Sequence, residues 1–152
     1  MSGQILLVED VDTDAELSIV ALRRAKIANP VVRVRNGAEA LDYLYARGEF
    51  KGRDAGDLPA VVLLDLRMPG LDGHEVLKVV RADARLTTLP IVVLLGSPGE
   101  ARSLADRDDP AACFACKPLD REQLLAAARN LRLFWLIVTE APIAPAQPVI
   151  RL

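Results

Sequence analysis

Three short apolar runs in the chain each end in charged residues. A run of five apolar residues precedes Asp65, a run of four precedes Glu9 and Asp10, and a third short stretch precedes Lys117. Runs of this length between turn signals are typical of buried strands. Parallel strands end at the same edge of a sheet, and ligands bind at that edge in open α/β sheets. We therefore expect these charged side chains to meet in one cleft although they are far apart in the sequence.

The charges of this cleft indicate the kind of ligand. Carboxylates that crowd together repel one another, and a hard divalent cation bound through oxygen is the usual remedy. Two acidic sites and one ammonium predict a site for Mg²⁺ and a phosphoryl group. The alternative interpretation of Glu9 and Asp10 is favourable charge at the start of a helix. It explains one of the two acids but not their alignment with Asp65 and Lys117.

Strand-like and helix-like segments alternate along the chain. We expect strands at residues 5–8, 31–34, 60–64, 90–95 and 114–116. We expect Asp12 or Thr13 to cap a first helix, further helices to start at Asn36-Gly37, after Asp72 and near Pro98, and Asp120 to cap the last one. A polar loop is expected at residues 48–59. In the first helix the apolar positions are Leu17, Val20, Ala21 and Leu22. Such alternation predicts an α/β fold with a doubly wound five-stranded parallel sheet and helices on both faces.

Composition excludes several classes of function. The chain has 152 residues with 19 basic and 21 acidic side chains, a net charge of −2, which argues against nucleic-acid binding. No apolar stretch approaches the length of a membrane span. Residues 1–4 lead directly into the first strand with no cleavage site, so we expect a cytoplasmic protein.

Cys113 and Cys116 form a C-x-x-C pair, which can indicate a redox or metal site. Residues three apart on a strand point to opposite faces, so we interpret them as two small buried thiols. A structural zinc site would need four clustered ligands, and His74 is the only histidine of the chain. We expect His74 to be a solvated helix residue.

The motifs together resemble a known family. They are Val8-Glu9-Asp10, the segment 64–73 (Leu-Asp-Leu-Arg-Met-Pro-Gly-Leu-Asp-Gly) and Lys117-Pro118. In this order they are similar to the receiver domain of two-component response regulators, over about residues 4–136. The resemblance implies a flavodoxin-like fold and an aspartate that takes a phosphoryl group from the phosphohistidine of a partner kinase.

The resemblance also implies a role for each site residue. Asp65 would be the phosphoacceptor, because a carboxylate can attack phosphorus to form an acyl phosphate. Asp10, Asp65 and the Arg67 backbone carbonyl would bind Mg²⁺, with Glu9 acting directly or through a water molecule. Lys117 would neutralise the phosphoryl oxygens, aimed by a Lys117-Pro118 bond that is cis in the family.

One position departs from the family pattern. The family has a threonine or serine at the end of its fourth strand, whereas this chain has Leu95, which carries no hydroxyl. Gly96 would leave open space beside the phosphoryl group, and Ser97 offers a hydroxyl two positions after Leu95. Phe114 fills the aromatic switch position of the family, with plain core packing as the equal alternative.

The C-terminal region carries an excess of apolar residues. Leu124, Ala128, Leu131 and Trp135 are spaced as the sheet-facing stripe of a long last helix. Leu133, Phe134, Ile137 and Val138 extend around other faces of that helix, which predicts a homodimer interface. Prolines 142, 145 and 148 recur at the polyproline period. We therefore expect a receiver domain at 1–138 and an extended arm at 139–152.

Two features narrow the resemblance. Residues 134–136 and the loop containing Gly48-Glu49-Phe50 look like the stand-alone receivers that partner bacterial phytochrome histidine kinases, which have no output enzyme. A haloacid dehalogenase type of enzyme would need a second acid at position 67, where this chain has Arg67. A phosphorylation-independent dimeric interaction module is the stronger alternative, because Leu95 removes a switch residue.

Overall fold

A central sheet of five parallel strands organises the chain. The computed structural model describes residues 3–96, 112–131, 137–139 and 149–151. The strand order is β2-β1-β3-β4-β5, and every neighbouring pair is parallel. The strands are β1 (Ile5–Val8), β2 (Val31–Val34), β3 (Val61–Asp65), β4 (Ile91–Leu95) and β5 (Ala112–Cys116). The predicted α/β, doubly wound, flavodoxin-like fold is confirmed.

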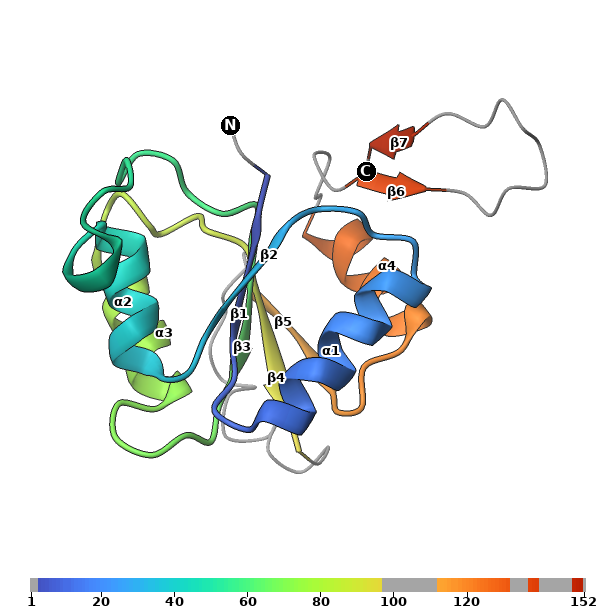
Figure 1. Cartoon of the computed structure of the whole chain (residues 1–152), viewed down its shortest axis with the longest axis horizontal. Coiled ribbons are helices and arrows are strands. Elements are labelled where there is room, and N and C mark those ends of the chain that lie inside the picture. The colour runs from blue at the N-terminus through green and yellow to red at the C-terminus, as the bar shows by residue number, and fades with distance from the viewer. Residues whose placement is uncertain (1–2, 97–111, 132–136, 140–148, 152) are drawn as a thin grey trace.

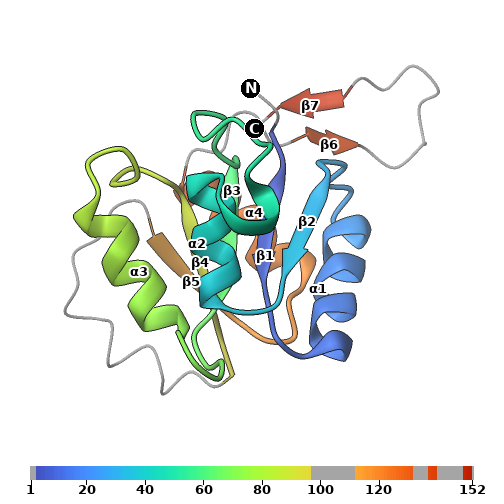
Figure 2. The same cartoon turned by 60° about the vertical axis from the view of Figure 1, so that its left-hand side comes forward.

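Helices cover both faces of this sheet. Two of them, α1 and α4, lie on one face, while α2 and α3 lie on the other (Figures 1 and 2). Their bounds are α1 (Asp12–Arg24), α2 (Gly37–Tyr45), α3 (Gly73–Ala82) and α4 (Arg121–Asn130), with a 3₁₀ turn, η1 (Gly48–Phe50), in the loop before β3. None of the helices within the described ranges combines the length and the apolar character needed to cross a bilayer.

The sheet separates two apolar clusters. The α1–α4 cluster includes Ile5, Leu7, Ala15, Leu22, Leu63, Leu94, Leu124 and Ala128. The α2–α3 cluster includes Leu6, Val8, Leu41, Leu44, Leu64, Val76, Leu77, Val93 and Leu95. Successive residues of each strand enter opposite clusters, so β1, β3 and β4 are buried along their whole length. This explains why their sequences are continuous apolar runs rather than alternating ones.

Three of the helices begin where side-chain caps predict. The side chains of Asn36, Asp72 and Asp120 accept hydrogen bonds from the backbone N–H groups of the first turns of α2, α3 and α4. The prediction for α1 is wrong, because Val11 holds its cap position and Asp12 is already helical. Asp12 accepts instead from Arg33 and Arg35, both at 2.9 Å.

The apolar positions of α1 divide between core and solvent. Ala21 and Leu22 are buried in the α1–α4 cluster as expected, whereas Leu17 and Val20 are exposed. Our assignment of all four to the packed face is therefore wrong for two of them. Ala15 and Ser18 are also buried on this helix. Their small side chains allow α1 to pack closely against the sheet.

The C-terminal region differs from the prediction. Helix α4 ends at Asn130, and Ile137 and Val138 belong to strand β6 (Ile137–Thr139), which pairs antiparallel with β7 (Val149–Arg151). The predicted long helix is therefore wrong at these positions, and Thr139, which we assigned to the arm, lies in β6. A run of β-branched residues, Ile-Val-Thr, favours a strand over a helix. The expectations for Leu133, Phe134, Trp135, Ser97 and the helix near Pro98 lie outside the described residues.

Candidate functional site

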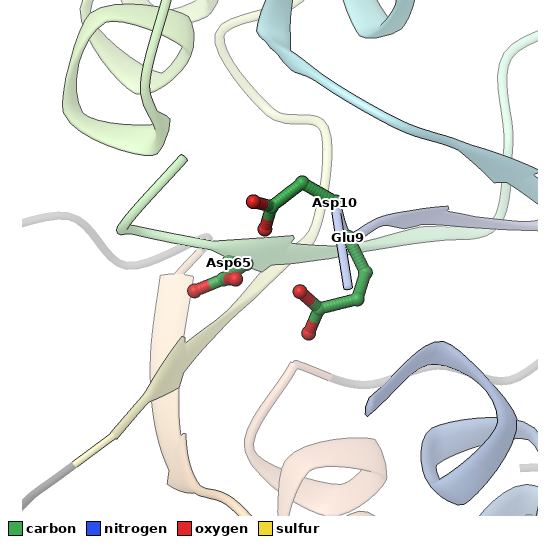
Figure 3. Close-up of side chains that lie close together, drawn as sticks. All are labelled: Glu9, Asp10 and Asp65. Atoms are coloured by element: carbon green, nitrogen blue, oxygen red, sulfur yellow. The ribbon is translucent and has the colours of Figure 1, made fainter. Parts of the chain in front are cut away.

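Three carboxylates gather at the carboxyl edge of the sheet (Figure 3). Glu9 and Asp10 follow β1, and Asp65 is the last residue of β3. Because Val8 pairs with Leu64 in the β1–β3 register, the next residues, Glu9 and Asp65, are placed side by side. One oxygen atom of each acid lies within 4.8 Å of the others. Glu9 and Asp65 are buried, and Asp10 is half-buried.

Lys117 places an ammonium among these acids. Its Nζ lies 2.9 Å from Oε1 of Glu9 and 3.3 Å from Oδ2 of Asp65. The backbone N–H of Lys117 donates to the carbonyl oxygen of Leu95 at 2.8 Å, which ties the end of β5 to the end of β4. The Lys117-Pro118 peptide bond is cis. The structure thus brings together four of the residues that the sequence predicted.

Asp14 is a further partner of Lys117 that sequence reasoning missed. Its Oδ2 lies 3.0 Å from Nζ of Lys117, and it reaches the site from the first turn of α1. The available signal was its spacing of four residues from Asp10, which places both acids near the beginning of α1.

The charges of the site shift two pKa values. Burial raises the pKa of Glu9, and its hydrogen bond with the Asp65 carboxyl raises it further, against the opposing effect of Lys117. For Lys117, burial alone would lower the pKa, but hydrogen bonds to Glu9 and Asp14 and the charge of Asp65 raise it above its usual range. Lys117 is therefore a permanent cation at neutral pH.

The donor set fits a hard divalent cation. Within the described part of the chain, Oδ1 of Asp10 is buried and has no hydrogen-bond partner. A buried carboxylate oxygen without a partner is costly, and a cation supplies what it lacks. Its neighbours in the group are the oxygens of Glu9 and Asp65. For Arg67, the backbone N–H donates to Oδ1 of Asp65 at 3.2 Å, and the role of its carbonyl stays a prediction.

Arg33 supports the turn that carries the acids from β1 into α1. Its Nε donates to the carbonyl oxygen of Glu9 and its Nη1 to Asp12, both at 2.9 Å. This side chain comes from β2, the strand that pairs with β1. Sequence reasoning did not assign it a role, although two alternate arginines at the end of β2, Arg33 and Arg35, were a signal for an acidic neighbour.

The loop after Asp65 is tied to two glycines. The N–H of Gly73 donates to the carbonyl oxygen of Leu66 at 3.0 Å, and the N–H of Gly37 donates to that of Leu71 at 3.1 Å. A Cβ atom added at Gly73 would lie 2.4 Å from the backbone oxygen of Asp65, and one at Gly37 would lie 2.3 Å from that of Leu71. Both positions require glycine, because the loop folds back directly against the starts of α2 and α3.

The two switch positions have opposite environments. Leu95 is 1% exposed and packs in the α2–α3 cluster. Phe114 is 42% exposed, so the interpretation that it simply packs in the core is wrong. On an edge strand, a side chain without a neighbouring strand on one side is more easily left in solvent.

The remaining polar candidates stay outside the site. Cys113 packs against the α1–α4 cluster and Cys116 against the α2–α3 cluster, so the two thiols point to opposite faces as predicted. Both are free and half-buried rather than buried, and burial raises the pKa of Cys113 to about 11. His74 is half-buried at the start of α3 rather than fully solvated.

Comparisons with known proteins point to one family. The family model described as the response regulator receiver domain matches residues 5–129. The curated relative FilR2 of Methanothrix harundinacea, named a probable methanogenesis regulatory protein, is 36% identical over 91% of this chain and 86% of its own length. Response regulator Rcp1 of Synechocystis sp. is 31% identical over 92% of this chain and 93% of its own length.

Solved structures agree. The bacteriophytochrome response regulator RtBRR is 41% identical, covers 94% of this chain and 86% of its own, and superimposes with a TM-score of 0.83. The Mn²⁺-bound form of Rcp1 is 30% identical, covers 88% of this chain and 94% of its own, and gives a TM-score of 0.67.

Proposed function

The chain belongs to the family of response regulator receiver domains, and from that membership we propose that it is a cytoplasmic protein that accepts a phosphoryl group on Asp65 from a partner histidine kinase. The observation that carries this proposal is the convergence of Glu9, Asp10 and Asp65 with Lys117 at one edge of the sheet. The acceptor and the charges that would balance its phosphoryl group come from three different strand ends.

Each side chain has a distinct part in this chemistry. An oxygen of Asp65 forms the bond to phosphorus while the bond from phosphorus to the imidazole nitrogen of the donor breaks, and the imidazole leaves with that electron pair. The Arg67 N–H holds the other Asp65 oxygen in place, which orients the attacking carboxylate. Lys117, fixed as a cation, balances negative charge on the transferred group.

Mg²⁺ is the cation that we propose for the donor set of Glu9, Asp10 and Asp65. When bound, it would neutralise phosphoryl oxygens and keep several water ligands. The partnerless Oδ1 of Asp10 supports this assignment. A metal-bound form is also known for the relative Rcp1, in that case with Mn²⁺.

Labelling of the Asp65→Asn variant tests the proposal. Wild-type protein with Mg²⁺ and acetyl phosphate should gain the mass of one phosphoryl group in intact mass spectrometry, and Asp65→Asn should gain none, because an amide oxygen is a poor nucleophile. Asp72→Asn is the matched control, because Asp72 caps α3 outside the acidic group. Continued labelling of Asp65→Asn would place the acceptor elsewhere.

The partner kinase that we propose is a bacteriophytochrome. The support is the likeness to RtBRR, which is named a bacteriophytochrome response regulator. We propose no separate output enzyme and no nucleic-acid contact, in keeping with the small net charge of −2. Phosphoryl transfer from purified bacteriophytochromes, compared with transfer from an unrelated histidine kinase, tests this pairing. Equal transfer from both would contradict it.

A homodimer is the assembly that we propose. The apolar residues of its interface are Leu133, Phe134, Trp135, Ile137 and Val138. Burial of such side chains stabilises association by roughly 25 cal/mol per Å² without any need for phosphorylation. Phe134→Asp would place a carboxylate in that surface, at a cost of several kcal/mol if desolvated. Light scattering should report a wild-type dimer and a monomeric variant, and a monomeric wild type at micromolar concentration would refute the assignment.

One observation favours a second candidate function. Leu95 is buried among apolar side chains and offers no hydroxyl to a phosphoryl group. The protein could therefore act as a dimeric interaction module whose binding does not depend on phosphorylation. Partner binding that is equal for wild type and Asp65→Asn would favour this module over the phosphoacceptor.

A further inference from the structure

Lys117 has no hydrogen-bonding capacity to spare. Its Nζ lies 2.9 Å from Glu9, 3.0 Å from Asp14 and 3.3 Å from Asp65. An ammonium group has three donors and no acceptor, so the three carboxylates use all of them. A phosphoryl oxygen on Asp65 can bond to Lys117 only if one of these contacts opens.

Burial decides which contact opens most easily. The Glu9 side chain is 0% exposed and that of Asp65 is 6% exposed, whereas that of Asp14 is 37% exposed. A buried carboxylate that loses its cation is left uncompensated, at high cost. A carboxylate that can turn into water is solvated instead. The Asp65 contact, the longest of the three, passes to an oxygen of the phosphoryl group that Asp65 carries. A second phosphoryl oxygen can therefore bind Lys117 only where Asp14 or Glu9 gives way, and the exposed Asp14 gives way more easily.

The surroundings of Asp14 give it room to move. A cavity of about 310 Å³ lies between α1 and the segment after β5, lined by Asp14, Leu17, Ser18, Lys117, Pro118 and Leu119. Asp14 lies in the first turn of α1, so its backbone is held by the helix while its side chain can change rotamer. The Lys117–Asp14 contact can therefore break without a change in the fold.

We propose that Asp14 is a positioning residue that holds Lys117 in the unphosphorylated protein and releases it when a phosphoryl group reaches Asp65. The inference rests on the function proposed above, and it adds a competitor for the lysine. Asp14 opposes the phosphorylated state because it occupies a donor of Lys117 that the phosphoryl group needs. Removal of its charge should therefore favour phosphoryl binding.

Titration with beryllofluoride, a non-covalent phosphoryl analogue, in saturating Mg²⁺ measures this competition. Exposed ion pairs contribute about 0.2–1 kcal/mol, so Asp14→Asn should lower the half-saturating concentration by about 1.4- to fivefold. The initial rate of acetyl phosphate labelling should rise in the same direction. Affinity for Mg²⁺, followed by thermal shift, should not rise, because removal of a nearby negative charge cannot strengthen the binding of a cation.

Three variants separate this role from a general effect of charge or folding. Glu16→Gln removes an exposed acid from the same helix and should leave beryllofluoride affinity unchanged. Asp14→Glu keeps the charge and should resemble the wild type. In a Lys117→Ala background, Asp14→Asn should lose most of its effect, because the competition requires the lysine.

The outcomes divide cleanly. Wild-type protein that takes up neither label nor analogue would refute the proposed function, and this inference with it. A wild type that is labelled while Asp14→Asn shows unchanged or weaker affinity would refute the inference alone. An equal gain in Glu16→Gln, an Asp14→Asn effect that persists without Lys117, or a parallel gain in Mg²⁺ affinity would also refute it.

Discussion

The strand ends at the carboxyl edge of the sheet are of two kinds, charged and apolar. The ends of β1, β3 and β5 deliver buried or half-buried charged side chains that lie close together, whereas the end of β4, which lies between β3 and β5, delivers Leu95 to an apolar cluster. The backbones are equally regular, and the Lys117 N–H even donates to the Leu95 carbonyl. Under the proposed function, the groups that accept a phosphoryl group and the position that would sense it belong to separate strand ends.

Lys117→Ala, which disrupts the charged strand ends, should have the largest effect on stability. It leaves the buried Glu9 and Asp65 carboxylates without their cation. We expect the free energy of unfolding to fall by about 2–4 kcal/mol, because loss of one partner leaves a buried charge uncompensated. Urea denaturation measures the change.

The matched control for this substitution is Lys78→Ala, which removes an exposed lysine from α3. It should alter stability by less than about 0.5 kcal/mol. Equal effects of the two substitutions would show that the ammonium of Lys117 is not the element that holds the acids together.

The fold and the charged strand ends were largely predictable from the sequence. Continuous apolar runs indicate strands buried on both faces, and parallel strands bring Glu9, Asp65 and Lys117 to one edge whatever the details of the helices. These predictions depend on periodicity and topology, which a single sequence carries.

Other features depend on which face a side chain occupies, and the sequence does not fix that. Asp14 reaches Lys117 only because α1 packs at a particular angle on the sheet. Leu17 and Val20 have the spacing of packed residues yet lie in solvent. The end of α4 was missed because the apolar residues after Asn130 continue a helical period. The β-branched residues of β6 instead pair with the next strand of the chain, β7.

Leu95→Thr tests the apolar side of the comparison. It removes buried methyl groups and places a hydroxyl among the side chains of the α2–α3 cluster. We expect a loss of about 1–3 kcal/mol in the free energy of unfolding. We also expect a stronger structural response to beryllofluoride, measured as the change in backbone amide shifts by nuclear magnetic resonance.

Val93→Thr is the control for this change, because Val93 lies on the same strand and in the same cluster but away from the strand end. It should lower stability without a gain in the response. If Leu95→Thr responded no more than Val93→Thr, the missing hydroxyl would not explain any difference in signalling.

The smallest expected effect on stability concerns Asp83, an acid far from the charged strand ends, which serves as a reference for Glu9 and Asp65. Tyr45 donates to Asp83 at 2.6 Å, and this hydrogen bond lowers the pKa of Asp83. A lowered folded pKa contributes stability above the ordinary aspartate pKa, and that contribution is lost as the pH falls through the folded value. Tyr45→Phe should therefore be slightly less stable than wild type near pH 7 and equal to it in strong acid.

Urea midpoints at neutral and strongly acidic pH measure this difference. Tyr43→Phe is a useful comparison, because the hydroxyl of Tyr43 accepts from the amide of Gln4 and not from a titrating group. Its effect should not depend on pH in the acid range. A pH-independent effect of Tyr45→Phe would show that the contact with Asp83 is not what stabilises the pair.

Any attempt to transplant this site to another protein would have to include the loop between β3 and α3. Its ends are held where Gly73 and Gly37 leave no room for a methyl group. A designer who grafted only the acids and the lysine onto a new parallel sheet would copy the charges but not the loop that returns across the Asp65 carbonyl. A transplanted site would therefore need glycine at both positions as well as the carboxylates and the lysine.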